Sequence, residues 1–175
     1  MRRILGSVAV LVTAMVALVG GVPAGATAAA RGAVVGDQAP CTEQYKWYSP
    51  GYWTYVKVRV CLTMDDAGDG RVRVETADSS YKGEGHGIWH DADPSYPATW
   101  SAYGTVANGD AVFGWSIDEQ RQTSPDGQAD STGSLPTPDC GQYDIELNFR
   151  QTGPRWDEPR DVIDPGTQYA TVVVC

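Results

Sequence analysis

The sequence lacks the common signatures of catalysis and of cofactor binding. It contains no G-x-S-x-G, no H-E-x-x-H and no C-x-x-C spacing, so neither hydrolase chemistry nor a thiolate metal centre is indicated. Two histidines leave few carriers for acid–base chemistry near neutral pH. We therefore expect a protein that is not an enzyme and that holds no cofactor and no metal ion.

Basic residues are scarce as well. The chain has 13 Lys and Arg against 22 Asp and Glu, which gives a formal net charge of −9. Proteins bind nucleic acids largely by neutralising phosphates with Lys and Arg, so no nucleic-acid partner is expected. The acidic residues are spread along the chain, which is typical of a solvated, secreted surface.

There is one long apolar run, Ile4 to Val19, and its 16 residues fall short of the roughly 20 that span a bilayer as a helix. The basic start Met1-Arg2-Arg3 precedes it, and small residues with two A-x-A sites, 26–28 and 28–30, follow it. This pattern predicts a secretory signal peptide over 1–30; an uncleaved anchor is the alternative. We expect a secreted, extracellular protein with a flexible segment at 31–40, one domain at 41–175 and no membrane contact after cleavage.

No sustained helical periodicity follows the leader. Short alternating stretches separated by Gly, Pro and Asn turns predict an all-β fold. We expect an antiparallel β-sandwich of seven to nine strands, immunoglobulin-like or jelly-roll-like, with two disulfides.

The segment 41–62 predicts a β-hairpin that turns at Pro50-Gly51. A three-residue loop, 50–52, places Trp47 opposite Tyr55 and Cys41 opposite Cys61. The same register pairs Tyr45 with Lys57 and Glu43 with Arg59, and leaves alternate valines on the core face. A two-residue loop would shift the register by one and would need a bulge to bring the cysteines together.

Two further strand pairs are expected. Asn108-Gly109 predicts a tight turn within 99–118, with small residues opposite large ones, such as Ala102 opposite Trp115. Two strands are expected near the end of the chain, at 143–149 and 168–174. If Cys140 lies opposite Cys175, apolar residues of one strand pair with apolar residues of the other. An exported chain is expected to oxidise its four cysteines, so this register favours the disulfides Cys41–Cys61 and Cys140–Cys175.

Other polar segments carry weaker signals. The Asp-rich stretch 64–70 matches a calcium loop only in part, and a plain turn is favoured. His86 and His90 would lie about 13 Å apart on one strand face, too far to share a metal ion. We expect a turn at 78–80, a strand around 86–90 and a mobile loop over 119–139.

The candidate function is that of a binding module. On the predicted hairpin one outward face carries a set of aromatic and basic side chains that could stack on sugar rings and bond their hydroxyls: Tyr45, Trp47, Trp53, Tyr55, Lys57 and Arg59. The simpler explanation is that these rings only stabilise the hairpin as cross-strand pairs. The expected partner is an extracellular glycan or a secreted protein.

Two alternatives remain open. A protein-interaction or protease-inhibitor module would use an exposed loop, either 49–53 or 151–166, and a disulfide-backed loop lowers the ordering cost of binding. A small glycoside hydrolase would need two carboxylates about 5–9.5 Å apart, for which Asp118, Glu119, Asp144 and Glu146 offer combinations.

Overall fold

The computed structural model describes residues 39–85, 87–156 and 160–175. The predicted signal peptide at 1–30, nearly all of the segment at 31–40 and His86 lie outside the described residues. The helices in the described ranges include none that is long and apolar enough to cross a membrane.

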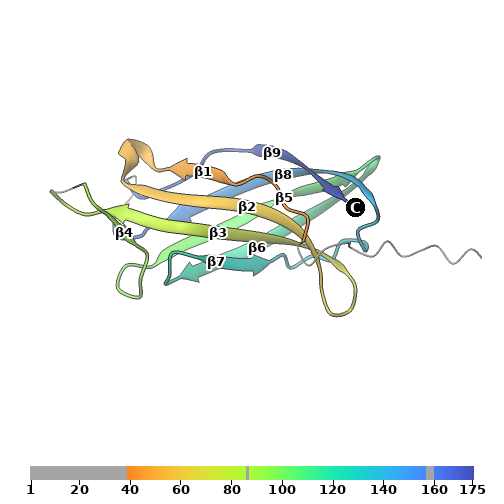
Figure 1. The fold of residues 1–175 in the computed structure, drawn as a ribbon, viewed down its shortest axis with the longest axis horizontal. Coiled ribbons are helices and arrows are strands. Elements are labelled where there is room, and N and C mark those ends of the chain that lie inside the picture. The colour runs from red at the N-terminus through yellow and green to blue at the C-terminus, as the bar shows by residue number, and fades with distance from the viewer. Residues whose placement is uncertain (1–38, 86, 157–159) are drawn as a thin grey trace, which may run out of the picture. The chain divides into compact units, whose positions relative to one another are not determined.

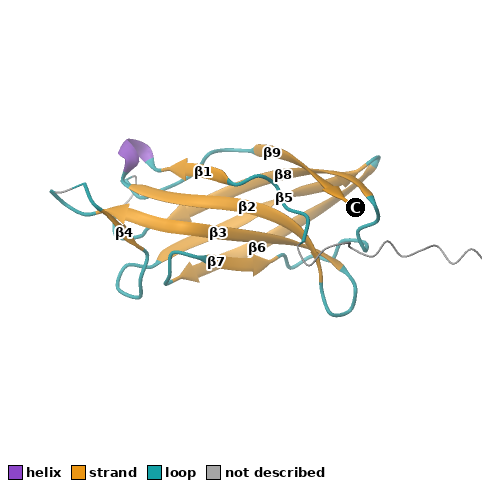
Figure 2. Cartoon of the chain, viewed as in Figure 1, coloured by secondary structure: helices purple, strands orange, loops and turns teal. Residues whose placement is uncertain are grey.

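Two antiparallel sheets pack face to face, as predicted for a β-sandwich (Figures 1 and 2). The first sheet, sheet A, is a meander of four strands with a fifth strand paired to its third. Its strands are β1 (Tyr45–Tyr48), β2 (Thr54–Met64), β3 (Gly70–Lys82), β4 (Trp89–Asp91) and β7 (Gly127–Asp130).

The second sheet, sheet B, has the strand order β6-β5-β8-β9. Its strands are β5 (Ala98–Asn108), β6 (Ala111–Gln122), β8 (Gly141–Thr152) and β9 (Gln168–Val174). The chain therefore passes from sheet A to sheet B after β4, returns for β7 and crosses again before β8. The nine strands found in the described residues agree with the expected number.

The core lies between the sheets and is built from alternate residues of the long strands. Val56, Val58 and Val60 of β2 are fully buried, and Ile145 and Leu147 of β8 face them from sheet B. Period-2 alternation is what allows a strand to bury one face and solvate the other. The predicted sandwich follows from this alternation.

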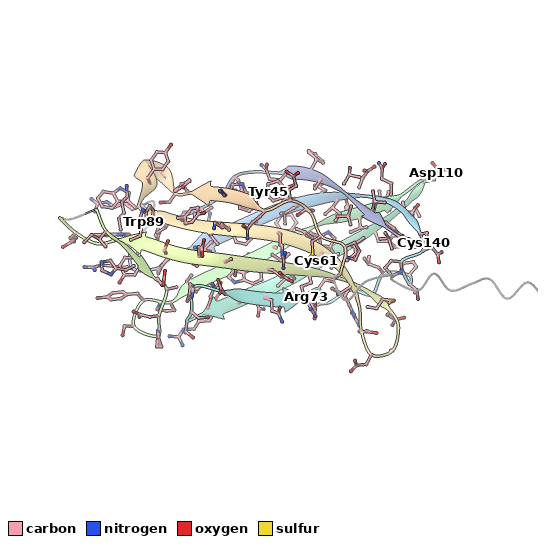
Figure 3. All side chains as sticks on the ribbon, viewed as in Figure 1. Tyr45, Cys61, Arg73, Trp89, Asp110 and Cys140 are labelled. Carbon is pink, nitrogen blue, oxygen red and sulfur yellow. A yellow bond between two sulfur atoms is a disulfide. The ribbon has the colours of Figure 1, made fainter. Side chains whose placement is uncertain are left out.

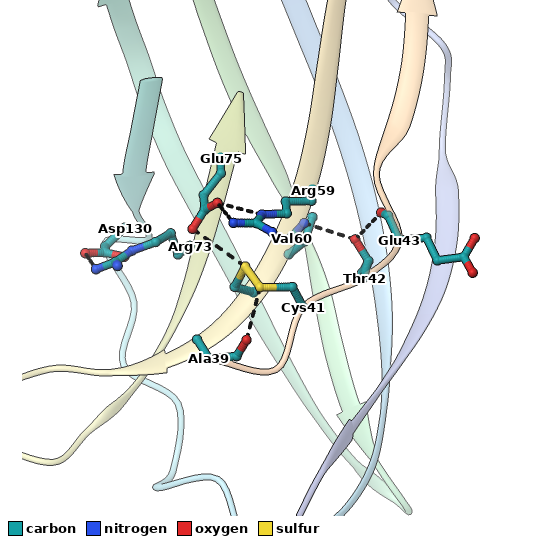
Figure 4. Close-up of a disulfide and its surroundings, with 10 residues drawn as sticks. Ala39, Cys41, Thr42, Glu43, Arg59, Val60, Arg73, Glu75 and Asp130 are labelled. Carbon is teal, nitrogen blue, oxygen red and sulfur yellow. Dashed lines mark hydrogen bonds and ion pairs between the residues drawn. A yellow bond between two sulfur atoms is a disulfide. The ribbon is translucent and has the colours of Figure 1, made fainter. Parts of the chain in front are cut away.

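Both predicted disulfides are formed, Cys41–Cys61 and Cys140–Cys175. The second lies at the end of the β8–β9 pairing, where every predicted residue pair is found, including Tyr143 with Val172. At the first, the Pro40 carbonyl accepts a bond from Leu62 N, and the Thr42 hydroxyl accepts one from Val60 N (Figure 4). Disulfides of this kind are typical of oxidising compartments.

The predicted register of the first hairpin is wrong between the cystine and the turn. Trp47 pairs with Val56 instead of Tyr55, and Tyr48 takes the place opposite Tyr55. One reason is the turn, which spans four residues, 50–53, closed by a bond from Ser49 N to Thr54 O. The other is that the first strand has one residue more between Cys41 and Tyr45 than the second strand has between Val58 and Cys61. This extra residue brings Cys41 back opposite Cys61. A shift of one residue moves every side chain of a strand to the other face.

The β5–β6 hairpin turns one residue later than predicted. Gly109 and Asp110 form the turn, with Gly109 at φ 57°, and Asn108 pairs with Ala111. From 102 to 108, each residue of β5 pairs with the residue two positions further along β6 than predicted. The predicted faces are therefore kept, but the partners change, and Trp115 lies opposite Gly104. A side chain at Gly104 would overlap the Glu146 carbonyl, so a small residue is required beside the indole.

Three segments predicted as turn, strand or loop differ from expectation. Residues 78–80 lie within β3, where Asp78 forms a bulge at φ 53° instead of a turn. The strand expected at 86–90 begins only at Trp89. The polar segment 119–139 is not a mobile loop, because it completes β6, forms β7 and buries Leu135 beside Gly70.

Replacing Trp115 tests the core. Trp115→Ala removes an indole that is 5% exposed in the core and is expected to lower the free energy of unfolding by about 3–5 kcal/mol. Val112→Ala, on the same strand but 62% exposed, is the control and should change it by less than about 0.5 kcal/mol. Urea unfolding measures both; equal effects would contradict the assigned faces.

Candidate functional site

The six side chains predicted to form one binding face lie in three different environments. Tyr45 and Trp47 turn toward the core, where the Trp47 ring lies 5.3 Å from Phe149, so the prediction that they share the outward face of the hairpin is wrong. Trp53 belongs to the turn and contacts the Trp156 ring edge-on at 5.1 Å. Tyr55 faces outward from sheet A together with the remaining two members, Lys57 and Arg59.

The two predicted ligand-binding cations are engaged within sheet A. Lys57 forms an ion pair with Asp78, the bulge residue of β3. Arg59 donates to Glu75 at 2.6 Å beside the first cystine (Figure 4). Such pairs on a sheet face contribute little each, but they occupy the donors that a ligand would need. The middle of the outward face of β2 therefore carries a short ladder of two ion pairs.

Four aromatic rings lie at the end of sheet A that carries the 50–53 turn. We call them the aromatic patch: Tyr48, Tyr52, Tyr55 and Trp89. The Tyr48 ring stacks on Tyr55 at 4.7 Å and lies 5.0 Å from Tyr52. Trp89 joins from β4, 6.0 Å from Tyr55. Figure 3 shows Trp89 at the end of the sandwich away from Cys140.

The aromatic patch is open to solvent. Tyr52 is 60% exposed, Tyr48 45% and Trp89 38%, and the Lys82 ammonium lies over the Trp89 ring at 5.3 Å. Tyr48 and Tyr55 are a non-hydrogen-bonded pair, because the next pair, Ser49 and Thr54, is hydrogen-bonded; side chains approach most closely at such positions. The strand register therefore brings these rings together.

Two groups at this end of β2, Tyr55 and Lys57, have pKa values above their ordinary ones. Burial raises the pKa of the Tyr55 phenol above its ordinary value. The hydrogen bond to Asp78 raises the pKa of the Lys57 ammonium, and the neighbouring Tyr55 adds to this. Tyr55 therefore stays a neutral phenol near neutral pH, and Lys57 stays a charged ammonium beside it.

A groove of about 700 Å³ adjoins the patch and shares Tyr48 and Tyr52 with it. One wall is the strand and turn from Lys46 to Tyr52, and the other is the segment 162–165 with Arg150, whose guanidinium lies 3.6 Å from the Asp164 carboxylate. The two loops predicted separately as interaction loops, 49–53 and 151–166, thus meet in one place.

A cluster of rings and guanidinium groups joins the segments around Trp53, Tyr96 and Trp156. The Trp156 indole donates to the Lys82 carbonyl at 3.1 Å, which ties the 151–166 connector to the end of β3. Arg160 lies over the Trp53 ring at 5.5 Å, and Arg155 lies over the Tyr96 ring at 5.2 Å. Cation–π contacts of this kind hold irregular segments in place where no strand pairing is available.

Sequence reasoning missed Tyr48, Tyr52, Trp89 and Lys82. Tyr48 and Tyr52 were within the hairpin that was singled out, but its register placed Tyr48 on the core face. Trp89 comes from a three-residue strand whose partner is 80–82 of β3, and no local pattern announces that pairing. The exposed Tyr48 ring could have been found by testing the alternative hairpin register, which moves it to the outward face.

Two of the carboxylates considered for glycoside hydrolysis, Asp144 and Glu146, are bonded to neighbours on sheet B. Asp144 accepts a hydrogen bond from the Thr171 hydroxyl at 2.9 Å, and Glu146 accepts one from Thr105 at 3.4 Å. In the part of the chain that the structure describes, no group of three or more His, Cys, Asp or Glu side chains is placed to hold a metal ion.

Comparison of the chain with protein-family models, with curated proteins and with solved structures finds no match.

The Asp-rich turn between β2 and β3 is closed by Asp65. Its carboxylate accepts bonds from Arg71 at 2.8 Å and from the amides of Ala67 and Asp69, both at 3.0 Å. The bond from Arg71, followed by that from the Asp69 amide, lowers the pKa of the Asp65 carboxyl. The oxygens that a calcium ion would need are used by the turn itself.

Asp65→Asn tests this turn. Because the folded pKa of Asp65 lies below its unfolded value, the carboxylate stabilises the fold above about pH 4, and this contribution is lost as pH falls through the folded pKa. The variant is expected to melt below wild type at pH 7, with the difference shrinking at pH 2–3. Asp66→Asn, at an exposed neighbour, is the control; an equal effect there, or a difference independent of pH, would contradict the account.

Proposed function

We propose that this chain is a secreted, non-catalytic binding module and that its ligand is an extracellular protein, bound at the aromatic patch and the adjoining groove. The observation that carries the proposal is the convergence of exposed rings from β1, the turn and β4 beside a groove walled by two loops. Tyrosine, tryptophan and arginine are the residues that most often dominate binding energy at protein interfaces.

The arrangement of the rings supports a protein ligand over a glycan. Tyr48 and Tyr55 stack on each other, and the Trp89 plane is inclined by 62° to Tyr55 and by 56° to Tyr48. A sugar ring needs an open aromatic face, whereas these rings cover part of one another. Tilted rings at the mouth of a groove suit protruding side chains of a protein, because the groove offers concave apolar surface rimmed by polar groups.

The groove walls are held in advance of binding. The connector is fixed by Trp156 and Arg160, and Thr54 Oγ1 donates to the Asp161 carbonyl at 3.2 Å from the base of the turn. A site that is already ordered loses less conformational entropy when its ligand arrives.

Secretion is the part of the proposal that concerns location. Its support is the leader-like sequence at 1–30 together with two disulfides, which persist in oxidising compartments outside the cytosol. An extracellular protein ligand is consistent with that location.

Substitutions in the patch test the proposed ligand surface. The mature protein, immobilised, is expected to capture a protein from the extracellular fraction of the cells that produce it. Trp89→Ala and Tyr48→Ala should each weaken that complex about 30-fold, as measured by titration calorimetry, because they remove exposed anchor rings. Neither ring is in the sandwich core, so both variants should remain folded.

Tyr103→Ala is the matched control, because Tyr103 is an equally prominent tyrosine on the outer face of sheet B. It should bind as wild type does. Equal losses for all three variants would overturn the assignment of the surface, and retention on insoluble polysaccharides with no protein ligand would replace the protein by a glycan.

A further inference from the structure

Strand β9 is the outermost strand of sheet B, and its free edge presents a regular set of backbone groups (Figure 1). Gln151 of β8 and Ile163 exchange two backbone hydrogen bonds on the side of β8 that also carries β9. The backbone amides and carbonyls of the odd-numbered residues of β8 therefore point toward β9. Their partners on β9 are the even-numbered residues, such as Ala170 opposite Ile145. The amide and carbonyl groups of Tyr169, Thr171 and Val173 consequently point away from the sheet.

A second contact gives the same orientation. The hydroxyl of Tyr45, from β1, donates to the carbonyl of Tyr169 at 3.4 Å, which agrees with a carbonyl that points away from β8. The side chains of Tyr169, Thr171 and Val173 lie exposed on the outer face of sheet B.

Within the residues that the structure describes, the Tyr45 hydroxyl reaches this edge at the Tyr169 carbonyl, and the edge otherwise lacks the features by which sheets avoid pairing with other chains. Short length, charged side chains, proline and covering segments are the usual protections. β1, β4 and β7 have four, three and four residues. β6 carries Asp118, Glu119 and Arg121, and Thr132 covers it by donating to Ser116 O at 3.0 Å. β9 has seven residues, and its sequence QYATVVV contains neither charge nor proline.

We propose that β9 pairs with β9 of a second copy of this chain. The strand is complementary to itself when run antiparallel about Thr171. Tyr169 then lies opposite Val173 of the second copy, Thr171 lies opposite its own counterpart, and Val173 lies opposite Tyr169. Aromatic residues beside β-branched residues, and threonine beside threonine, are favoured cross-strand pairs.

The backbone groups fit the same register. Tyr169, Thr171 and Val173 all point outward, and pairing about Thr171 matches outward residues only with outward residues, so their amides and carbonyls can exchange hydrogen bonds. The Tyr169 carbonyl has a second lone pair for the amide of the second copy beside the bond from the Tyr45 hydroxyl. The core-side residues Ala170 and Val172 meet each other in this arrangement, which keeps that face apolar. The dimer is isologous, closes after two copies and joins two sheets B into one eight-stranded sheet.

The edge itself adds no charge repulsion to the contact between two chains that each have a net charge of −9. No charged side chain occurs between Thr167 and Cys175. The residues of the aromatic patch lie on other strands, so the dimer does not depend on the proposed ligand.

The mass of the mature protein in solution tests the proposal. Sedimentation equilibrium up to about 1 mM, a concentration that detects even weak specific association, should show a monomer–dimer equilibrium for wild type. Val173→Lys should weaken dimerisation at least tenfold by placing two ammonium groups at the edge. Val112→Lys is the matched control, because Val112 has nearly the same exposure, 62% against 66%, on the same face of sheet B but on β6.

A cross-link tests the register. Thr171→Cys should give a disulfide-linked dimer on oxidation, since the two copies of residue 171 face each other, whereas Val112→Cys should not; free cysteines are absent from the described part of wild type. Circular dichroism checks that each variant is folded. A monomeric wild type at all concentrations, dissociation by Val112→Lys in place of Val173→Lys, or no linked dimer for Thr171→Cys would each overturn the proposal.

Discussion

Every long strand of the sandwich must turn one set of alternate side chains into the gap between the two sheets, and this requirement determines what the surface can present. On β2 the valines at 56, 58 and 60 occupy the gap, so Tyr55, Lys57 and Arg59 are forced outward. A strand paired with β2 must follow the same parity. β1 therefore shows solvent only the residues that lie opposite outward residues of β2, which is why Tyr48 and not Trp47 reaches the surface.

This requirement also explains how much the sequence alone could predict. The pairing of β8 with β9 was predicted residue by residue, because apolar parity and two cysteines point to one register. β1 was misassigned because aromatic residues occur at both parities, Trp47 at one and Tyr48 at the other, so parity alone could not choose between them. The extra residue after Cys41 leaves no mark in composition. β5 and β6 slipped by two residues, an error that polarity cannot reveal because it keeps the faces.

The candidate site follows from the β1 register. The observed register turns Tyr45 and Trp47 toward the core and places Tyr48 opposite Tyr55. Trp89 of β4 lies beside these two tyrosines and completes the patch. Trp89 and the groove wall at 162–165 depend on contacts between distant segments, which local patterns do not contain. Cations on the outer face of sheet A pair with neighbouring carboxylates, so the ring-rich end differs in character from the rest of that face. The patch and the free edge of β9 belong to different strands, so the two proposed interaction surfaces are separate.

The central claim is the assignment of two adjacent residues to opposite faces, and hydroxyl-radical footprinting read by mass spectrometry measures it directly. Each residue's oxidation rate in the folded protein is divided by its rate in the unfolded chain. We predict that Tyr48 keeps a large share of its unfolded rate, whereas Trp47, packed against Phe149, is strongly protected. Protection of Tyr48 together with free reaction of Trp47 would restore the other register and contradict the account.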